Sequence, residues 1–326
     1  MVLAVWVVLW AGVWGAANAV WTQQRPPDDA RRRGALETIK LPGGARVEFK
    51  SFSSPSLGQD RPYSVFLPPS YDTDKTRKYP VVYFLHGLNN DHTSWTVERY
   101  GRLHEKLEAM VKKGTIPEII MVHPKDDNSF YTNTADGKRP YEDFIVKDLV
   151  QHVETTYRVK KGREYRAIGG TSMGGYGALK VAMRHPDLYA TVVGHSPIVF
   201  PQESPFGAAD EVKDSSRFYG YFRNLLIRIY GDPINREHWE ANNLLVLATQ
   251  RRQGFNKLKI YFDYGTADRY NGTIQLGAGC QKLHRILDEQ KVPHVFKEHA
   301  NEPHGWELVS SHFAESVPFL CQTFGK

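Results

Sequence analysis

The chain alternates between short apolar runs and longer amphipathic segments from about residue 46 onward. Residues 81–85 (VVYFL) form a continuous apolar run, as expected for a strand that is covered on both faces. Other strands are expected where short apolar or alternating runs are bounded by turn residues, at 46–51, 63–66, 119–122, 166–168, 191–193, 259–264 and 295–298.

Helical segments lie between these strands, at 97–112, 142–157, 174–184, 274–290 and 306–321. Strands that alternate with helices require a mostly parallel sheet with helices on both faces. The sequence therefore predicts an α/β fold with one domain over residues 39–326. Residues 201–243, rich in aromatic, charged and small polar residues, break the rhythm and are expected to form an insertion over the active-site edge.

The N-terminus has the pattern of an export signal. Residues 2–14 are apolar and uncharged, and Ala17-Asn18-Ala19 fits the small-residue rule for signal peptidase. The run is short for a membrane span, and no Lys or Arg precedes it. We expect a signal peptide at 1–19 and a linker at 20–38, hence a secreted or periplasmic protein. A retained membrane anchor is the alternative.

Composition narrows the class of protein. The 326 residues are 41% hydrophobic and 24% charged, which is typical of a globular protein, and the net charge is +6. Basic residues are dispersed, with one run of three at 31–33, so the sequence argues against a nucleic-acid partner. The two cysteines, Cys280 and Cys321, have no metal-site spacing. They are either a disulfide pair or two buried thiols.

The strongest chemical signal is the pentapeptide Gly170-Thr171-Ser172-Met173-Gly174. A G-x-S-x-G match alone is weak, but this one follows a predicted strand and precedes a predicted helix, as a nucleophile elbow requires. The glycines allow the tight strand–helix crossing, and the helix N-terminus favours negative charge near Ser172. Ser172 is therefore the predicted nucleophile.

A second signal lies at the end of the strand at 81–85, where His86-Gly87-Leu88 follows. Hydrolases with this elbow take one oxyanion-hole amide from such a loop and the other from the residue after the nucleophile. The expected donors are the backbone N–H groups of Leu88 and Met173. His86 is expected to orient the loop rather than to carry a proton.

A serine nucleophile needs a base and an orienting acid, which follow it in the chain in this fold. Asp268 lies in the loop beyond the strand at 259–264 and is the preferred acid, with Asp263 in reserve. His304 lies in a loop between the last strand and the last helix and is the preferred base. The competing side chains are three histidines and one nearby carboxylate: His294, His299, His312 and Glu302.

The chain resembles the esterase D / putative esterase family of α/β-hydrolases. This group includes feruloyl and acetylxylan esterases, S-formylglutathione hydrolase and the antigen 85 mycolyltransferases. The motifs that carry the resemblance span nearly the whole mature chain: residues 61–68, Leu85-His86-Gly87 with Trp95, Ser129-Phe130-Tyr131, residues 141–157, the elbow, Asp268 and His304-Gly305-Trp306. The resemblance implies the triad Ser172, Asp268 and His304, and the oxyanion amides of Leu88 and Met173.

Together these features predict a secreted serine carboxylesterase that acts through an acyl-enzyme and needs no metal or organic cofactor. Feruloyl or acetyl esters of polysaccharides, or related small esters, are the expected substrates. Four aromatic residues either line a substrate cleft or pack in the core: Trp95, Tyr131, Tyr176 and Trp306. The alternatives are acyl transfer to a sugar hydroxyl, an S-formylglutathione hydrolase-like thioesterase, and a binding protein without catalysis. Oligomeric state stays open.

Overall fold

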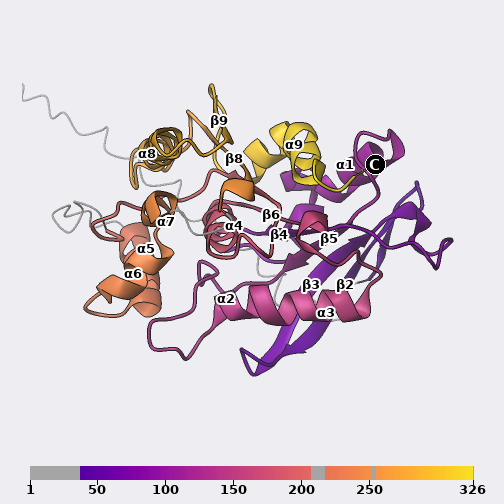
Figure 1. The fold of residues 1–326 in the computed structure, drawn as a ribbon, viewed down its shortest axis with the longest axis horizontal. Helices are drawn as coiled ribbons and strands as arrows, with labels where there is room; N and C mark the ends of the chain where they lie inside the picture. The colour runs from indigo at the N-terminus through magenta and orange to yellow at the C-terminus, as the bar shows by residue number, and fades with distance from the viewer. Residues whose placement is uncertain (1–36, 207–216, 251–254, 326) are drawn as a thin grey trace, which may run out of the picture. The chain divides into compact units, whose positions relative to one another are not determined.

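A nine-stranded sheet runs through the residues that the computed structural model describes, which are 37–206, 217–250 and 255–325. The strand order is β1-β2-β3-β5-β4-β6-β7-β8-β9 (Figure 1). The strands are β1 Ile39–Lys40, β2 Arg46–Ser54, β3 Gln59–Leu67, β4 Val81–Leu85, β5 Ile120–Pro124, β6 Arg166–Thr171, β7 Thr191–His195, β8 Lys259–Gly265 and β9 His294–His299.

The sheet is antiparallel from β1 to β5 and parallel from β5 through β4 to β9. The central strands β4, β6 and β7 are buried along their whole length, which explains the continuous apolar sequence of β4, while β6 and β7 also bury polar residues at their ends. Because the parallel strands share one direction, their carboxyl ends meet at one edge. The loops after β4, β6, β8 and β9 therefore lie at a common edge of the sheet.

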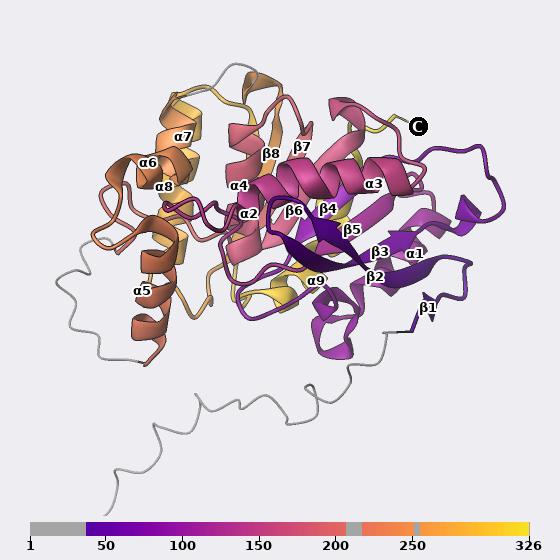
Figure 2. The same cartoon turned by 90° about the horizontal axis from the view of Figure 1, so that it is seen from below.

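Helices cover both faces of the sheet. One core layer packs α1 (Leu103–Lys112) and α9 (Trp306–Cys321) against alternate residues of the strands. The other layer contains α3 (Val150–Thr156), α4 (Met173–Arg184) and α8 (Leu276–Glu289). Figure 1 shows α1 and α9 on one side and α3 on the other, and Figure 2 shows α3 and α4 in front of the strands.

The α/β architecture with a mostly parallel sheet and helices on both faces is confirmed. All eight predicted strands occur, with bounds that differ by a few residues, and β1 is additional. The helix expected at 97–112 begins only at Leu103, because a turn at Glu98–Tyr100 ends at Gly101 with φ 82°. The helix expected at 142–157 is α2 (Tyr141–Asp143), a π-helical segment Phe144–Leu149 and α3 in succession.

The described part of the expected insertion at 201–243 has two helices joined by turns. It contains α5 (Arg217–Tyr230) and α6 (Arg236–Asn242), and α7 (Leu244–Gln250) follows. These helices lie together beside α8 in both views (Figures 1 and 2).

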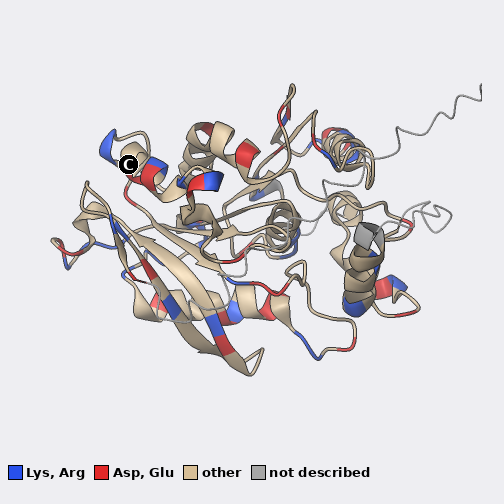
Figure 3. Ribbon diagram, turned by 180° about the vertical axis from the view of Figure 1, so that it is seen from behind, with Lys and Arg blue, Asp and Glu red and all other residues tan. Residues whose placement is uncertain are grey.

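The predicted signal peptide at 1–19 and most of the linker at 20–38 lie outside the described residues. Among the helices of the described ranges, none is long and apolar enough to cross a membrane. Cys280 and Cys321 are free, buried thiols. Over the described ribbon, basic and acidic residues are interspersed (Figure 3).

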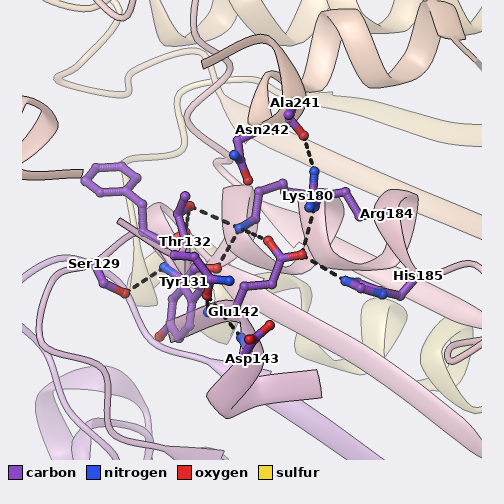
Figure 4. A network of polar contacts seen from close by, with 12 residues as sticks. Ser129, Tyr131, Thr132, Glu142, Asp143, Lys180, Arg184, His185, Ala241 and Asn242 are labelled. Atoms are coloured by element: carbon purple, nitrogen blue, oxygen red, sulfur yellow. Dashed lines mark hydrogen bonds and ion pairs between the residues drawn. The ribbon is translucent and has the colours of Figure 1, made fainter. Parts of the chain in front are cut away.

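A buried ionic network connects α4 to residues 131–142. Lys180 is fully buried, and its ammonium group donates to Glu142 (2.7 Å), to the Tyr131 carbonyl (2.6 Å) and to the Thr132 hydroxyl (3.0 Å) (Figure 4). Glu142 also accepts from Arg184 (2.8 Å) and lies 2.8 Å from His185. The network ties the helix that follows the elbow to the loop that carries Tyr131.

The protonation states in this network follow from burial and charge. Burial lowers the pKa of Lys180 to about 8, and the Glu142 charge opposes this shift. Burial opposes ionisation of Glu142, but the charges of Lys180 and Arg184 and the contact with His185 hold its pKa well below the ordinary value. Glu142 is therefore an anion shared by cationic neighbours.

Glu142→Gln should lower the free energy of unfolding by about 3–5 kcal/mol, because it leaves the buried Lys180 ammonium without its counter-charge. Urea denaturation would measure the loss. The double variant Glu142→Leu/Lys180→Met should lose less, since it removes both buried charges. A loss of unfolding free energy below about 1 kcal/mol, the value of a neutral hydrogen bond, would contradict a buried ion pair between Glu142 and Lys180.

Candidate active site

Ser172 occupies a strained turn between β6 and α4. Its backbone has φ 58° and ψ −119°, a combination that costs a non-glycine residue on the order of 1–3 kcal/mol. The Ser172 amide donates to the His195 carbonyl at 2.7 Å, which fixes the turn against β7. The predicted strand–turn–helix setting is therefore present, with Ser172 at the N-terminus of α4.

Two glycines make this turn possible. A Cβ atom on Gly170 would lie 2.3 Å from the Gly174 carbonyl oxygen, and one on Gly174 would lie 2.2 Å from the Leu85 carbonyl oxygen. Real Cβ atoms do not approach oxygen so closely, and the neighbours here are backbone atoms that cannot turn aside. The G-x-S-x-G spacing thus lets α4 cross directly over the end of β4.

Ser172, His304 and Asp268 form one hydrogen-bonded chain. His304 Nε2 lies 2.8 Å from the Ser172 hydroxyl oxygen, and His304 Nδ1 lies 2.5 Å from Asp268 Oδ2. Asp268 Oδ1 accepts from the Tyr270 amide at 2.9 Å, so both carboxylate oxygens are engaged. The Tyr270 ring meets the His304 ring edge to face, with centroids 4.6 Å apart. The imidazole is therefore held from two sides.

The acid and the base meet because two loops approach closely at the end of β8. A Cβ atom on Gly265 would lie 2.0 Å from the Glu302 carbonyl oxygen, so only glycine fits there. The Ala267 amide donates to the same carbonyl at 3.1 Å. This contact joins the loop of Asp268 to the loop of His304.

The reserve acid, Asp263, lies in a different buried network. It is 2.9 Å from His195 Nδ1 and 3.1 Å from His299 Nε2, and it accepts from the Tyr261 hydroxyl at 3.0 Å. Burial opposes its ionisation, but His195 and His299 hold the pKa of Asp263 below its ordinary value. Asp263 is thus the partner of His195 and His299, and the backbone carbonyl of His195 in turn accepts from the Ser172 amide. The sequence patterns did not predict this network.

The other competing side chains also have partners elsewhere. His299 stacks on His312, with ring centroids 3.5 Å apart, and Glu302 lies 3.8 Å from His312 Nε2. His294 lies at the first position of β9, and its Nε2 is 2.8 Å from His284 Nδ1. Of the histidines weighed from the sequence, His304 is the one that the structure brings to Ser172.

The loop of Leu88 lies against Ser172. Gly87 packs so closely that a Cβ atom there would lie 3.3 Å from the Ser172 Cβ, and Leu88 is the next residue. His86 fixes the loop, because its Nδ1 donates to the Gly87 carbonyl (2.8 Å) and its Nε2 accepts from the Asp126 amide (2.9 Å). The Tyr131 hydroxyl donates to the His86 carbonyl at 3.0 Å.

These contacts give His86 a defined chemical state. An imidazole that donates through one nitrogen and accepts through the other is neutral. Burial lowers the pKa of His86 to about 4, and its hydrogen bond to Gly87 opposes the shift. His86 is therefore suited to shaping the loop and unsuited to proton transfer near neutral pH.

Most of the chain matches the model of a known protein family. Residues 54–316 match the model of the putative esterase family. The chain belongs to the putative esterase family. The match covers the elbow and both partners of Ser172, and the family together with the serine-hydrolase geometry identifies the protein as a carboxylic ester hydrolase of the serine type.

Solved structures of esterases share the fold. A ferulic acid esterase is 25% identical, with a TM-score of 0.68 over 86% of this chain and 99% of that chain. An S-formylglutathione hydrolase from Agrobacterium tumefaciens is 17% identical, with a TM-score of 0.68 over 89% and 99%. A ferulic acid esterase from the anaerobic fungus Anaeromyces mucronatus is 21% identical, with a TM-score of 0.60 over 92% and 96%. The last two show a likeness of fold alone.

The four aromatic residues considered for a substrate cleft are buried in this esterase, and each has at most 3% of its surface exposed: Trp95, Tyr131, Tyr176 and Trp306. Trp95 stacks on His123 at 4.0 Å, and the Tyr176 hydroxyl donates to the Asn242 carbonyl at 2.7 Å. Trp306 Nε1 donates to Asn90 at 2.9 Å. These contacts favour packing and positioning roles.

A polar cluster that the sequence patterns did not predict lies beside the loop of Leu88. Asn89 directly follows Leu88, and its Oδ1 accepts from the Tyr221 hydroxyl (3.0 Å) and from Asn128 Nδ2 (2.9 Å). Tyr221 belongs to α5 and is exposed. The insertion therefore contacts the loop that carries Leu88.

The pH dependence of stability should report the neutral state of His86. Because its folded-state pKa is lowered from 6.5 to about 4, its contribution is complete above about pH 6.5 and is lost as the pH falls through about 4. The contribution is on the order of 3 kcal/mol. Urea denaturation between pH 4 and 7.5 should show a shallower pH dependence for His86→Asn than for the wild type. Parallel curves would contradict a buried neutral imidazole.

Proposed function

We propose that the esterase hydrolyses its substrate through an acyl-enzyme formed on Ser172. The carrying observation is the continuous hydrogen-bonded chain from Ser172 through His304 to Asp268 at the carboxyl edge of the sheet. His304 takes the proton of the Ser172 hydroxyl as the oxygen attacks the ester carbonyl. Asp268 holds the tautomer of His304 and stabilises the imidazolium that forms.

The backbone amides of Leu88 and Met173 donate to the tetrahedral oxyanion in this mechanism. Met173 follows Ser172 at the N-terminus of α4, whose dipole favours negative charge. Leu88 follows Gly87, which packs against Ser172. Preorganised donors of this kind are each worth about 3–4 kcal/mol of transition-state stabilisation.

Collapse of the first intermediate expels the alcohol, which takes the proton from His304. Water then attacks the acyl-enzyme with His304 as the base, and the acid is released. His304 returns this proton to the Ser172 oxygen as the acid leaves, so the free enzyme is regenerated.

The proposed substrates are feruloyl or acetyl esters of polysaccharides, or related small esters, acted on after export directed by residues 1–19. Support for the substrate comes from the 25% identical structure, whose name is ferulic acid esterase and which is covered over 99% of its length. A panel of methyl ferulate, acetylated xylan, S-formylglutathione and short p-nitrophenyl esters separates these classes by kcat/KM. Preference for S-formylglutathione would overturn the polysaccharide-ester assignment.

Acyl transfer to a sugar is the second candidate, because the acyl-enzyme can react with a hydroxyl in place of water. Addition of saccharide acceptors to a turnover assay separates the two, since transfer gives an acylated sugar. We expect free acid as the product.

Ser172→Ala should reduce kcat for p-nitrophenyl acetate by a factor on the order of 10⁴–10⁶, because the nucleophile is gone. Circular dichroism should show an unchanged fold, and a fluorophosphonate probe should label the wild type alone. Labelling that persists in the variant would assign the nucleophile to another residue.

Asp268→Asn should reduce kcat by a factor on the order of 10⁴, because the orienting charge beside His304 is lost. Asp263→Asn is the matched control, since Asp263 is buried and contacts His195 and His299 instead. It should lower the melting temperature and leave kcat within about tenfold, in proportion to a structural role. The reverse pattern would make Asp263 the triad acid.

A further inference from the structure

Far from the triad, two histidines and an aspartate converge where α8 ends and β9 begins. His284 and Asp288 lie one turn apart on α8, and His294 is the first residue of β9. One ligand atom from each residue lies within 4.8 Å of the other two. His294 pairs with Ile260 at the start of the two strands, whereas the triad lies beyond their opposite ends.

The tautomer of His294 directs the lone pair of its Nε2 into the cluster. Its Nδ1 lies 2.8 Å from the Val292 carbonyl, and a carbonyl only accepts, so Nδ1 carries the proton. Nε2 therefore presents its lone pair toward His284. A backbone carbonyl that fixes the second nitrogen in this way is the usual support of a metal-bound histidine.

The three side chains face one another in a way that calls for a positive charge. His284 Nδ1 lies 2.8 Å from His294 Nε2, so it donates its proton there. His284 Nε2 and the Asp288 carboxylate are 3.4 Å apart, and His294 Nε2 is 3.9 Å from the same carboxylate. His284 Nε2 then has a lone pair that faces the negative Asp288 carboxylate. A second proton on His284, or a cation among the three groups, would remove this repulsion.

Aromatic rings of the neighbouring strands hold both imidazoles in place. His284 stacks on Phe296 with centroids 4.6 Å apart, and His294 stacks on Phe262 at 5.9 Å. His294 is nearly buried, whereas the Asp288 side chain is 62% exposed and free to adjust. The C-terminal end of a helix also favours a cation.

We propose that His284, Asp288 and His294 bind a zinc ion that joins the C-terminal end of α8 to the edge strand β9. Two imidazole nitrogens and a carboxylate oxygen suit zinc, with water as the fourth ligand. Ligand atoms about 2.0–2.1 Å from one ion are about 3.3 Å apart, so Asp288 moves closer and the two nitrogens move slightly apart. This proposal departs from the expectation that the protein binds no metal.

The site is separate from the proposed catalysis. Zinc here stabilises the folded state, because the unfolded chain does not hold the three ligands together. It should raise the melting temperature without changing kcat.

Isothermal titration of ZnCl₂ into EDTA-treated, full-length protein should show one equivalent bound, and thermal unfolding should shift upward by about 5 °C at saturating zinc. His284→Gln and Asp288→Ala should each weaken binding at least tenfold, a loss typical of a removed metal contact. Asp288 is exposed, so its variant tests the site even if His284→Gln folds poorly. Esterase activity of both variants should match the wild type.

His152→Gln is the matched control, because His152 is another partly exposed helix histidine, away from the cluster. It should bind zinc as the wild type does. CaCl₂ should give no comparable response, since calcium requires oxygen ligands. Absence of zinc binding, binding unchanged in His284→Gln and Asp288→Ala, or equal binding of calcium would each overturn the proposal.

Discussion

The close crossing of α4 over the end of β4 is the constraint on which the site depends. Gly174 packs against the Leu85 carbonyl and Gly170 against Gly174, at distances that admit no side chain. This crossing forces Ser172 into its positive-φ turn and brings it beside Gly87. This backbone crossing thereby sets the position of Ser172, the start of α4 and the place of the loop that contains Leu88.

The polar groups around this crossing are arranged to keep it rigid. Lys180 and Glu142 fasten α4 to the loop of Tyr131, and Tyr131 in turn holds the His86 carbonyl. On the other side, the Ser172 amide donates to the backbone carbonyl of His195, and the His195 ring contacts Asp263. The strained turn is thus supported by buried charges that already have their partners, which is the condition for strain to persist.

Sequence patterns predicted the fold and the roles at this site unequally well. The central strands could be found because both of their faces are covered, so β4 is apolar throughout and β6 and β7 have short apolar centres. His304 and Asp268 could be singled out because each follows a strand at the carboxyl edge. The Asp263 network could not, because its partners, His195 and His299, come from neighbouring strands and share no sequence spacing. The late start of α1 depends on the left-handed Gly101, which a hydrophobic pattern does not detect.

The two buried thiols lie on opposite faces of the sheet. Cys280 belongs to the core layer beneath α8, and Cys321 belongs to the layer beneath α9. Because α8 and α9 pack on opposite faces, the sheet itself separates the two sulfur atoms. A thiol-reactive label on Cys280 would therefore report when one layer detaches, and a label on Cys321 would report on the other. The labelling rates of the two cysteines therefore distinguish unfolding of one helical layer at a time from concerted unfolding of both.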